Sequence, residues 1–112
     1  MNYATKGTAN GTEVFYSVSN NRKGFGGITS QKMANLFRTQ LLKDLHTTNR
    51  GTKTAGYYVL KHNTVPSILI ELGFLSGSTD YSKLTNGTFQ KKAAKSIYTG
   101  IVSMFKTYPT GR

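Results

Sequence analysis

The sequence predicts an α/β fold, with one open, mostly parallel sheet of about three strands and two main helices. Residues 65–75 form an apolar run rich in Ile and Leu, which is typical of a strand buried on both faces. Residues 30–47 and 88–106 each carry apolar side chains at helical spacing. A chain of 112 residues is expected to form one domain at most, with residues 1–11 flexible.

The first half of the chain supplies a strand and a helix. Residues 12–18 alternate between two faces and predict the first strand. Residues 20–27 are rich in Asn and Gly, so a loop is expected there. Ser30 is the expected N-cap of the first helix, which should run to about Thr47.

The second half is expected to hold two further strands before the last helix. Residues 49–55 are predicted to be a loop and residues 56–60 a short second strand. The third strand should begin near Pro66, because the missing N–H of proline suits the start of a strand better than its middle. Asp80 resembles an N-cap, which predicts a short helical turn at residues 81–84.

The chain is strongly basic. Its net charge of +11 comes from 15 Lys and Arg against 4 Asp and Glu. Such a balance favours polyanionic partners, which include nucleic acid, anionic lipid and the teichoic acids and phosphates of a bacterial wall. The cations are spread along the chain without a run of five or six, which favours a generally basic surface over a nucleic-acid-binding tail.

Three kinds of sequence feature are missing. The absence of Cys excludes a disulfide framework and a Cys-based metal site. Met1 is followed by polar residues without an apolar core, so no signal peptide is expected. No apolar stretch has the length of a membrane span. If the protein acts outside the cell, an upstream segment, a partner gene or host lysis is expected to deliver it.

Glu71 is the residue that most directly indicates chemistry, because it interrupts the apolar run. Desolvating a carboxylate is costly unless a cation, a metal or a hydrogen-bond network meets it. Its position alone leaves two readings open, a functional carboxylate and a structural ion pair. Glu13, in the first strand, is expected to face solvent or to pair with a cation.

Four segments follow one another along the chain, namely residues 10–17, 49–53, 57–61 and 66–80. Their order resembles that in the zinc-dependent N-acetylmuramoyl-L-alanine amidases of the autolysin and phage-lysin type. The resemblance extends from about Asn10 to about Phe105. It implies that the chain is the C-terminal portion of an amidase-type α/β domain. The implied protein is a hydrolase that cleaves the N-acetylmuramoyl–L-alanine bond of peptidoglycan in the extracellular bacterial cell wall.

The same resemblance implies roles for individual residues. Glu71 matches the catalytic carboxylate of the family. The family's zinc ligands are a His, a Glu and a second His that lie upstream of the segment starting at Asn10. His46 and His62 match none of them. The complete family domain is therefore expected to use Zn²⁺, whereas this chain alone is expected to contain no metal ligands, to bind no zinc tightly and to be inactive.

Substrate contacts are expected from two loops. Arg50 and Lys53 form the family's Arg-Gly-x-Lys loop and could hold the carboxylates of a stem peptide, although a solvated loop explains them equally well. Asn63 flanks the expected cleft, but a turn also favours Asn at such a place. Residues 73–75 are expected to shape the cleft wall beside Glu71.

Two other functions remain open beside the peptidoglycan hydrolase. One is a catalytically inactive amidase-like protein that binds the cell wall or regulates a complete enzyme. The other is a small basic nucleic-acid binder, which the dispersed charges and the lack of a nucleic-acid motif oppose. If core elements of the usual domain are missing, the exposed sheet edge is also expected to promote self-association.

Overall fold

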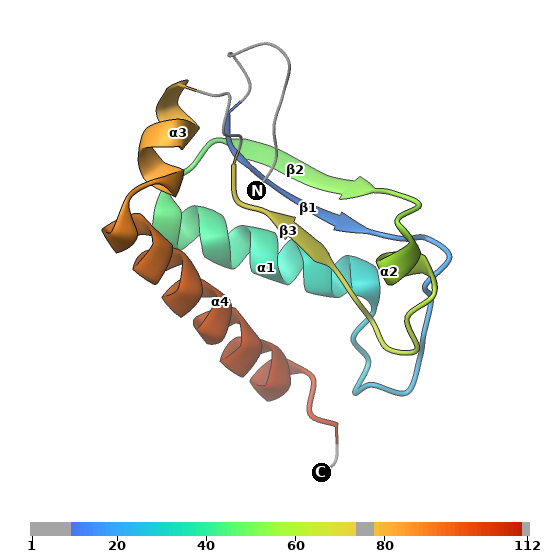
Figure 1. The fold of residues 1–112 in the computed structure, drawn as a ribbon. Coiled ribbons are helices and arrows are strands. Elements are labelled where there is room, and N and C mark those ends of the chain that lie inside the picture. Colours follow the sequence, from blue (N-terminus) through green and yellow to red (C-terminus); the bar gives the residue numbers. More distant parts are fainter. Residues whose placement is uncertain (1–9, 74–77, 111–112) are drawn as a thin grey trace.

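The computed structural model describes residues 10–73 and 78–110, which form a three-stranded sheet with helices against one of its faces (Figure 1). The strands are β1 (Thr12–Tyr16), β2 (Asn49–Thr54) and β3 (Leu69–Glu71), in the order β2-β1-β3. β1 pairs in parallel with β2 and antiparallel with β3, so the sheet is mixed. The predicted α/β class with three strands is confirmed.

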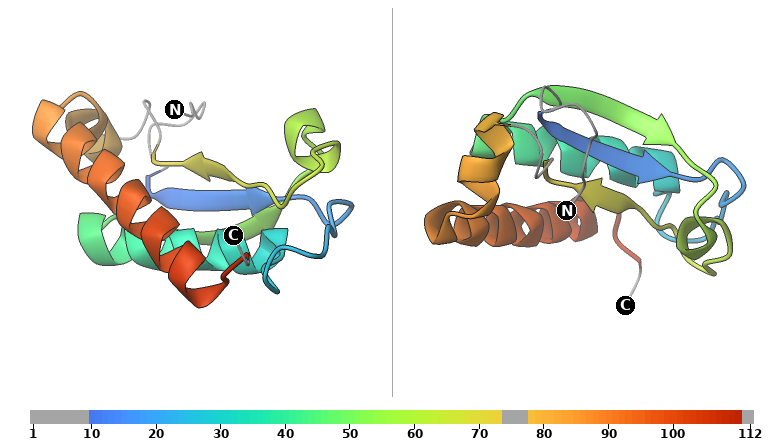
Figure 2. Two further views of the ribbon diagram at one scale, coloured as in Figure 1. Left: turned by 90° about the horizontal axis from the view of Figure 1, so that it is seen from below. Right: turned by 45° about the horizontal axis from the view of Figure 1, so that its top comes forward.

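Two long helices dominate the other layer, as predicted. They are α1 (Ser30–Leu45) and α4 (Gly87–Thr107), and two short helices, α2 (Tyr58–Lys61) and α3 (Ser78–Leu84), lie at the ends of the sheet. Figure 2 shows α1 and α4 together on one side of the sheet. No helix among the described residues is long and apolar enough to cross a membrane.

The core lies between the sheet and this helical layer. The buried stripe of α1 consists of Ala34, Phe37, Leu41 and Leu45 at helical spacing. Leu41 and Leu45 pack with Ala93 of α4, and Ile70 of β3 packs against the same cluster. Gly100 lets α4 approach α1 closely, because a Cβ there would lie 2.7 Å from the ring of Phe37.

Side chains cap the long helices. Thr29, rather than the predicted Ser30, is the N-cap of α1, and its side chain accepts a hydrogen bond from the Lys32 N–H. The Asn86 side chain caps α4 by accepting from two backbone N–H groups. α1 ends at Leu45, and His46 closes it in the left-handed conformation with φ 54°.

Two predictions about the middle of the chain are wrong. The expected loop at residues 49–55 contains β2, which forms because its backbone pairs in parallel with β1 although its side chains are polar. The expected strand at residues 56–60 contains the start of helix α2, in which Tyr58 and Val59 are exposed. Tyr and Val have a high strand propensity, but Tyr58 and Val59 do not pair in the sheet.

The buried strand predicted from Pro66 to about Gly73 is also wrong in extent. Only Leu69–Glu71 forms a strand, and all three residues are half-buried. Helices α1 and α4 cover only one face of the sheet, and β3 lies at its edge among the described residues. Asp80 lies in the first turn of α3 and is not its N-cap.

Candidate active site

Glu71 and Glu13 form the centre of the candidate site. Glu71 ends β3 and pairs in register with Glu13 of β1 across the antiparallel ladder. Residues directly opposite each other point to the same face of a sheet, so the two carboxylates are neighbours. The next pair, Val14 and Ile70, points to the other face, where Val14 is fully buried. The carboxylates therefore lie on the face that α1 and α4 leave uncovered.

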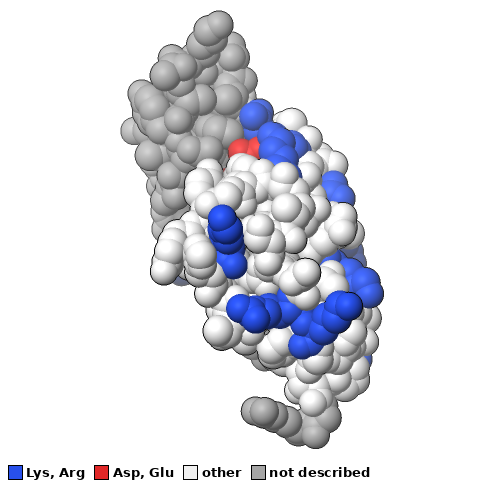
Figure 3. Space-filling view, turned by 90° about the vertical axis from the view of Figure 1, so that its right-hand side faces the viewer, with Lys and Arg blue, Asp and Glu red and all other residues white. Residues whose placement is uncertain are grey.

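Glu13 is a buried carboxylate with two cationic partners. Its residue is 4% exposed, and its Oε2 lies 2.5 Å from the Lys53 Nζ and 3.6 Å from the Arg50 Nε. Of the two expectations for Glu13, pairing with a cation is confirmed. Figure 3 shows a small acidic area beside basic side chains on a face that otherwise carries scattered cations.

An irregularity in β2 explains how both cations reach Glu13. Residues three apart in a regular strand point to opposite faces, so Arg50 and Lys53 would diverge. The register shifts here, because Thr12 pairs with Asn49 while Val14 pairs with Thr52. Gly51, with φ 89°, lies within this bulge. The extra residue turns both cations toward the face that carries Glu13.

The structure thus brings three of the four predicted site residues together and leaves one apart. Glu71, Arg50 and Lys53 meet around Glu13, which the sequence did not single out for a role in the site. Asn63 lies in the turn between α2 and β3, at the opposite end of the sheet from Glu71. Its Oδ1 accepts from the Val65 N–H at 3.4 Å, as a turn residue does.

A hydrogen-bond network fixes the end of the sheet where Glu71 lies. The Thr12 hydroxyl donates to the carbonyl of Leu72, directly after Glu71, at 3.1 Å. The same hydroxyl lies 2.7 Å from that of Thr47, which follows α1. Thr12 is fully buried, so these contacts fix the relative positions of β1 and the chain leaving β3.

Asp80 ties α3 to the same region. Its carboxylate accepts from the Gly11 N–H at 2.7 Å, and its own N–H donates to the Asn10 side chain at 3.1 Å. Gly73 permits this approach, since a Cβ there would lie 2.9 Å from the Asp80 carboxyl carbon. Gly73 thus lies beside this anchor, while Phe74 and Leu75, also expected in the cleft wall, lie outside the described residues.

The position of Glu71 differs from the rule for parallel sheets. In open parallel sheets, sites gather where the strands' carboxyl ends meet. Glu71 is at the carboxyl end of β3, but the antiparallel pairing places it beside the amino ends of β1 and β2. The site therefore arises from the pairing of β3 with β1 and not from a shared strand end.

The described residues do not fit a zinc site. In residues 10–73 and 78–110, no three His, Cys, Asp or Glu side chains lie close enough to hold a metal ion. His46 is exposed at the end of α1, and the ring of His62 lies 4.3 Å from that of Tyr58. A catalytic zinc normally takes three protein ligands, so the chemistry assigned to this chain is limited to its carboxylates and cations.

Comparison with known proteins identifies the family. The family profile described as N-acetylmuramoyl-L-alanine amidase matches residues 1–103. The chain belongs to this amidase family. It is 34% identical over 97 residues to the N-acetylmuramoyl-L-alanine amidase LytC of Bacillus subtilis, covering 87% of this chain and 18% of LytC.

Solved amidase structures share its fold. The amidase AmiC2 of Nostoc punctiforme matches with a TM-score of 0.81 and 30% identity, over 94% of this chain and 54% of that one. The CwlD amidase of Clostridioides difficile, solved in complex with the GerS lipoprotein, matches with a TM-score of 0.80 and 30% identity. The match covers 95% of this chain and 51% of that one. The chain therefore spans about half the length of these solved amidases.

Proposed function

We propose that this chain is the Glu71-bearing portion of a peptidoglycan hydrolase that cleaves the amide bond between N-acetylmuramic acid and L-alanine. The observation that carries the proposal is the carboxylate pair of Glu71 and Glu13, with Arg50 and Lys53 held beside it on the face of the sheet opposite α1 and α4. Family membership supports the reaction class. Residues beyond this chain would supply the ligands for the zinc ion of the complete domain.

Glu71 is proposed as the catalytic carboxylate. Amide hydrolysis needs a base that takes a proton from the attacking water and an acid that delivers one to the departing amine, and a single carboxylate can do both. Among the described residues, Arg50 and Lys53 form their ion pairs with Glu13 and not with Glu71. The Glu71 carboxylate is thereby left available for proton transfer.

Arg50 and Lys53 are proposed to hold the carboxylates of the stem peptide. Their side chains are 32% and 45% exposed, so each can contact a ligand while paired with Glu13. Charge-assisted hydrogen bonds of this kind are stronger than neutral ones. Asn63 lies at the other end of the sheet, so we assign it to the turn and not to this contact. Peptidoglycan is the proposed partner, and the extracellular cell wall the proposed location.

An assay for newly released amino groups tests this function. The chain is mixed with purified peptidoglycan and zinc, alone and together with the part of the AmiC2 domain that it does not cover. We expect no new alanine amino groups from the chain alone and their appearance in the mixture. Glu71→Gln should abolish this release.

Release that survives Glu71→Gln would reject Glu71 as the catalytic carboxylate. Reducing sugar ends in place of amino groups would reject the amidase reaction itself. If the mixture binds peptidoglycan but releases nothing, the inactive cell-wall-binding protein is the correct reading. Circular dichroism of the Gln variant shows whether its fold is retained.

A further inference from the structure

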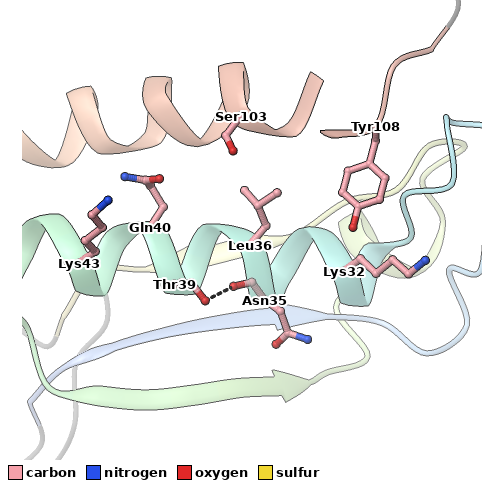
Figure 4. Close-up of a pocket in the computed structure, with 8 residues that line it drawn as sticks. All are labelled: Lys32, Asn35, Leu36, Thr39, Gln40, Lys43, Ser103 and Tyr108. Atoms are coloured by element: carbon pink, nitrogen blue, oxygen red, sulfur yellow. Dashed lines mark hydrogen bonds between the residues drawn. The ribbon is translucent and has the colours of Figure 1, made fainter. Parts of the chain in front are cut away.

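A basic groove runs between α1 and α4, away from the candidate active site. It consists of two adjoining hollows of about 520 and 410 Å³, which share Gln40 and Lys43. Figure 4 shows the larger hollow, where Gln40, Leu36 and Lys43 point from α1 toward α4, and Ser103 points back from α4. On α1 the groove extends from Lys32 to Asp44, roughly 18 Å at the rise of a helix.

Four lysines give the groove its charge. Lys32 and Lys43 come from α1, and Lys92 and Lys95 come from α4. The lysines at 43, 92 and 95 form no ion pair with any described carboxylate, and all are exposed. Like charges along both walls repel one another, so an anion between the helices would relieve this repulsion.

Among the described residues, Asp44 is the one acidic residue that lines the groove. A hydrogen bond from the Gln40 side chain, at 2.8 Å, is the largest cause that lowers the pKa of Asp44, and Ser96 adds a second hydrogen bond. The Asp44 carboxylate is thus engaged by hydrogen bonds from the polar side chains beside it. The groove keeps an excess of positive charge at neutral pH.

The remaining lining favours a hydroxyl-rich ligand over a nucleic acid. Gln40 and Ser103 point into the space between the two helices, while Thr39 and Thr99 line the hollows with hydroxyls that donate to carbonyls of their own helices. Proteins that bind single-stranded nucleic acids combine a basic groove with aromatic side chains on which bases stack. Here Tyr108 is the one aromatic side chain among the described lining residues, and it lies at one end. Polyol hydroxyls can instead exchange hydrogen bonds with such side chains.

We propose that the groove between α1 and α4 binds a linear polyol-phosphate polymer, with its phosphates on the lysines and its hydroxyls on the side chains of Gln40, Ser103, Thr39 and Thr99. This chemistry is that of an anionic polymer of the bacterial wall. The site is distinct from the face that carries Glu71 and does not rest on the proposed hydrolysis, because its ligand is neither cut nor contacted by the carboxylate pair.

Calorimetric titration of the chain with a synthetic glycerol-phosphate oligomer tests the proposal. The groove variant carries Lys92→Gln and Lys95→Gln. The control carries Lys23→Gln and Lys61→Gln, which remove the same charge from exposed positions outside the groove. Gln and Lys have similar helix propensity, so α4 should be retained. We expect saturable binding that the groove variant weakens about tenfold or more and the control by much less.

Two further measurements make this test more specific. Amide chemical shifts should move with the oligomer at Gln40, Ser96 and Ser103, and not around Glu13. An equal loss of affinity in the groove variant and the control would overturn the proposal, because general attraction to a basic surface would then explain the binding. Equal or tighter binding of an oligodeoxythymidine with the same number of phosphates would also overturn it, in favour of a nucleic-acid groove.

Discussion

Glu13 and Glu71 face each other in register across β1 and β3, yet the two carboxylates have different surroundings. Glu13 is 4% exposed and meets both Lys53 and Arg50, whereas in the part of the chain that the structure describes no cation forms an ion pair with Glu71. Glu13 thus holds two cations beside Glu71, the proposed catalytic carboxylate.

Lys53→Met should destabilise the fold. Among the described residues, the substitution leaves the buried Glu13 carboxylate with only the longer contact to Arg50, and a buried charge that loses a partner costs about 1–3 kcal/mol. Urea unfolding measures the change as a shift of the midpoint at constant slope. Lys91→Met, at an exposed position of α4, is the matched control and should change the stability by less than about 0.5 kcal/mol.

A double-mutant cycle checks the cause. In a Glu13→Gln background the buried charge is gone, so Lys53→Met should cost clearly less than in the native chain. Additive effects of the two substitutions would show that Lys53 stabilises the fold by some other contact.

Gly51→Ala should disturb the bulge that orients the side chains of Arg50 and Lys53 toward Glu13. A Cβ at Gly51 meets no atom within 4 Å, so the cost comes from its φ of 89°, a conformation that costs other residues roughly 1–2 kcal/mol. Gly56→Ala also meets open space, and no such φ is found there. Thermal unfolding compares the two variants, and Gly56→Ala should leave the melting temperature nearly unchanged. Equal melting temperatures for the two variants would argue against the bulge.

This bulge also explains what the sequence could predict and what it could not. The periodic patterns of β1, α1 and α4 gave these elements nearly their observed bounds. The apolar stripe of α1 is buried in the core, whereas Ile101 and Phe105 in the pattern of α4 are exposed. The segment 49–54 has no such stripe. Its strand depends on backbone pairing with β1, which no local pattern shows. A Gly between polar residues was read as a loop when it marked a bulge.

The site was predictable only in part for the same reason. Glu71 stands out because a carboxylate within an apolar run is unusual, and Arg50 and Lys53 entered through the resemblance. The contribution of Glu13 depends on a cross-strand register between residues 58 positions apart, and that register follows from the fold. Asp80 was read locally as a helix cap, although its partner Gly11 is 69 residues away.

Gly100→Ala should separate the two long helices. The new methyl group would lie 2.7 Å from the Phe37 ring, so α1 and α4 must move apart or the ring must rotate, at a cost of about 1–3 kcal/mol. Gly87→Ala, at the first residue of the same helix, meets no atom within 4 Å and should be neutral or slightly stabilising. Denaturant unfolding of both variants compares them. A stable Gly100→Ala protein would mean that the helices do not pack this closely.

The carboxyl of Asp44 should titrate below its ordinary value of 3.8, with Gln40 as the main reason. A pKa that is lower in the folded than in the unfolded chain adds stability above the unfolded value, and this stability is lost as the pH falls through the folded value. Gln40→Ala removes the strongest hydrogen bond, so the titration midpoint of Asp44 should rise toward 3.8. Carbon-detected NMR of the carboxyl measures this midpoint.

Lys43→Gln is the matched comparison for this titration. Its charge contributes less to the lowered pKa of Asp44 than the hydrogen bonds from Gln40 and Ser96, so the midpoint should rise by less than in Gln40→Ala. The stability lost through Gln40→Ala should also shrink as the pH falls below 3.8, because a protonated Asp44 no longer depends on that hydrogen bond. If Lys43→Gln moves the midpoint further than Gln40→Ala, the lysines of the groove and not the amide control this carboxylate.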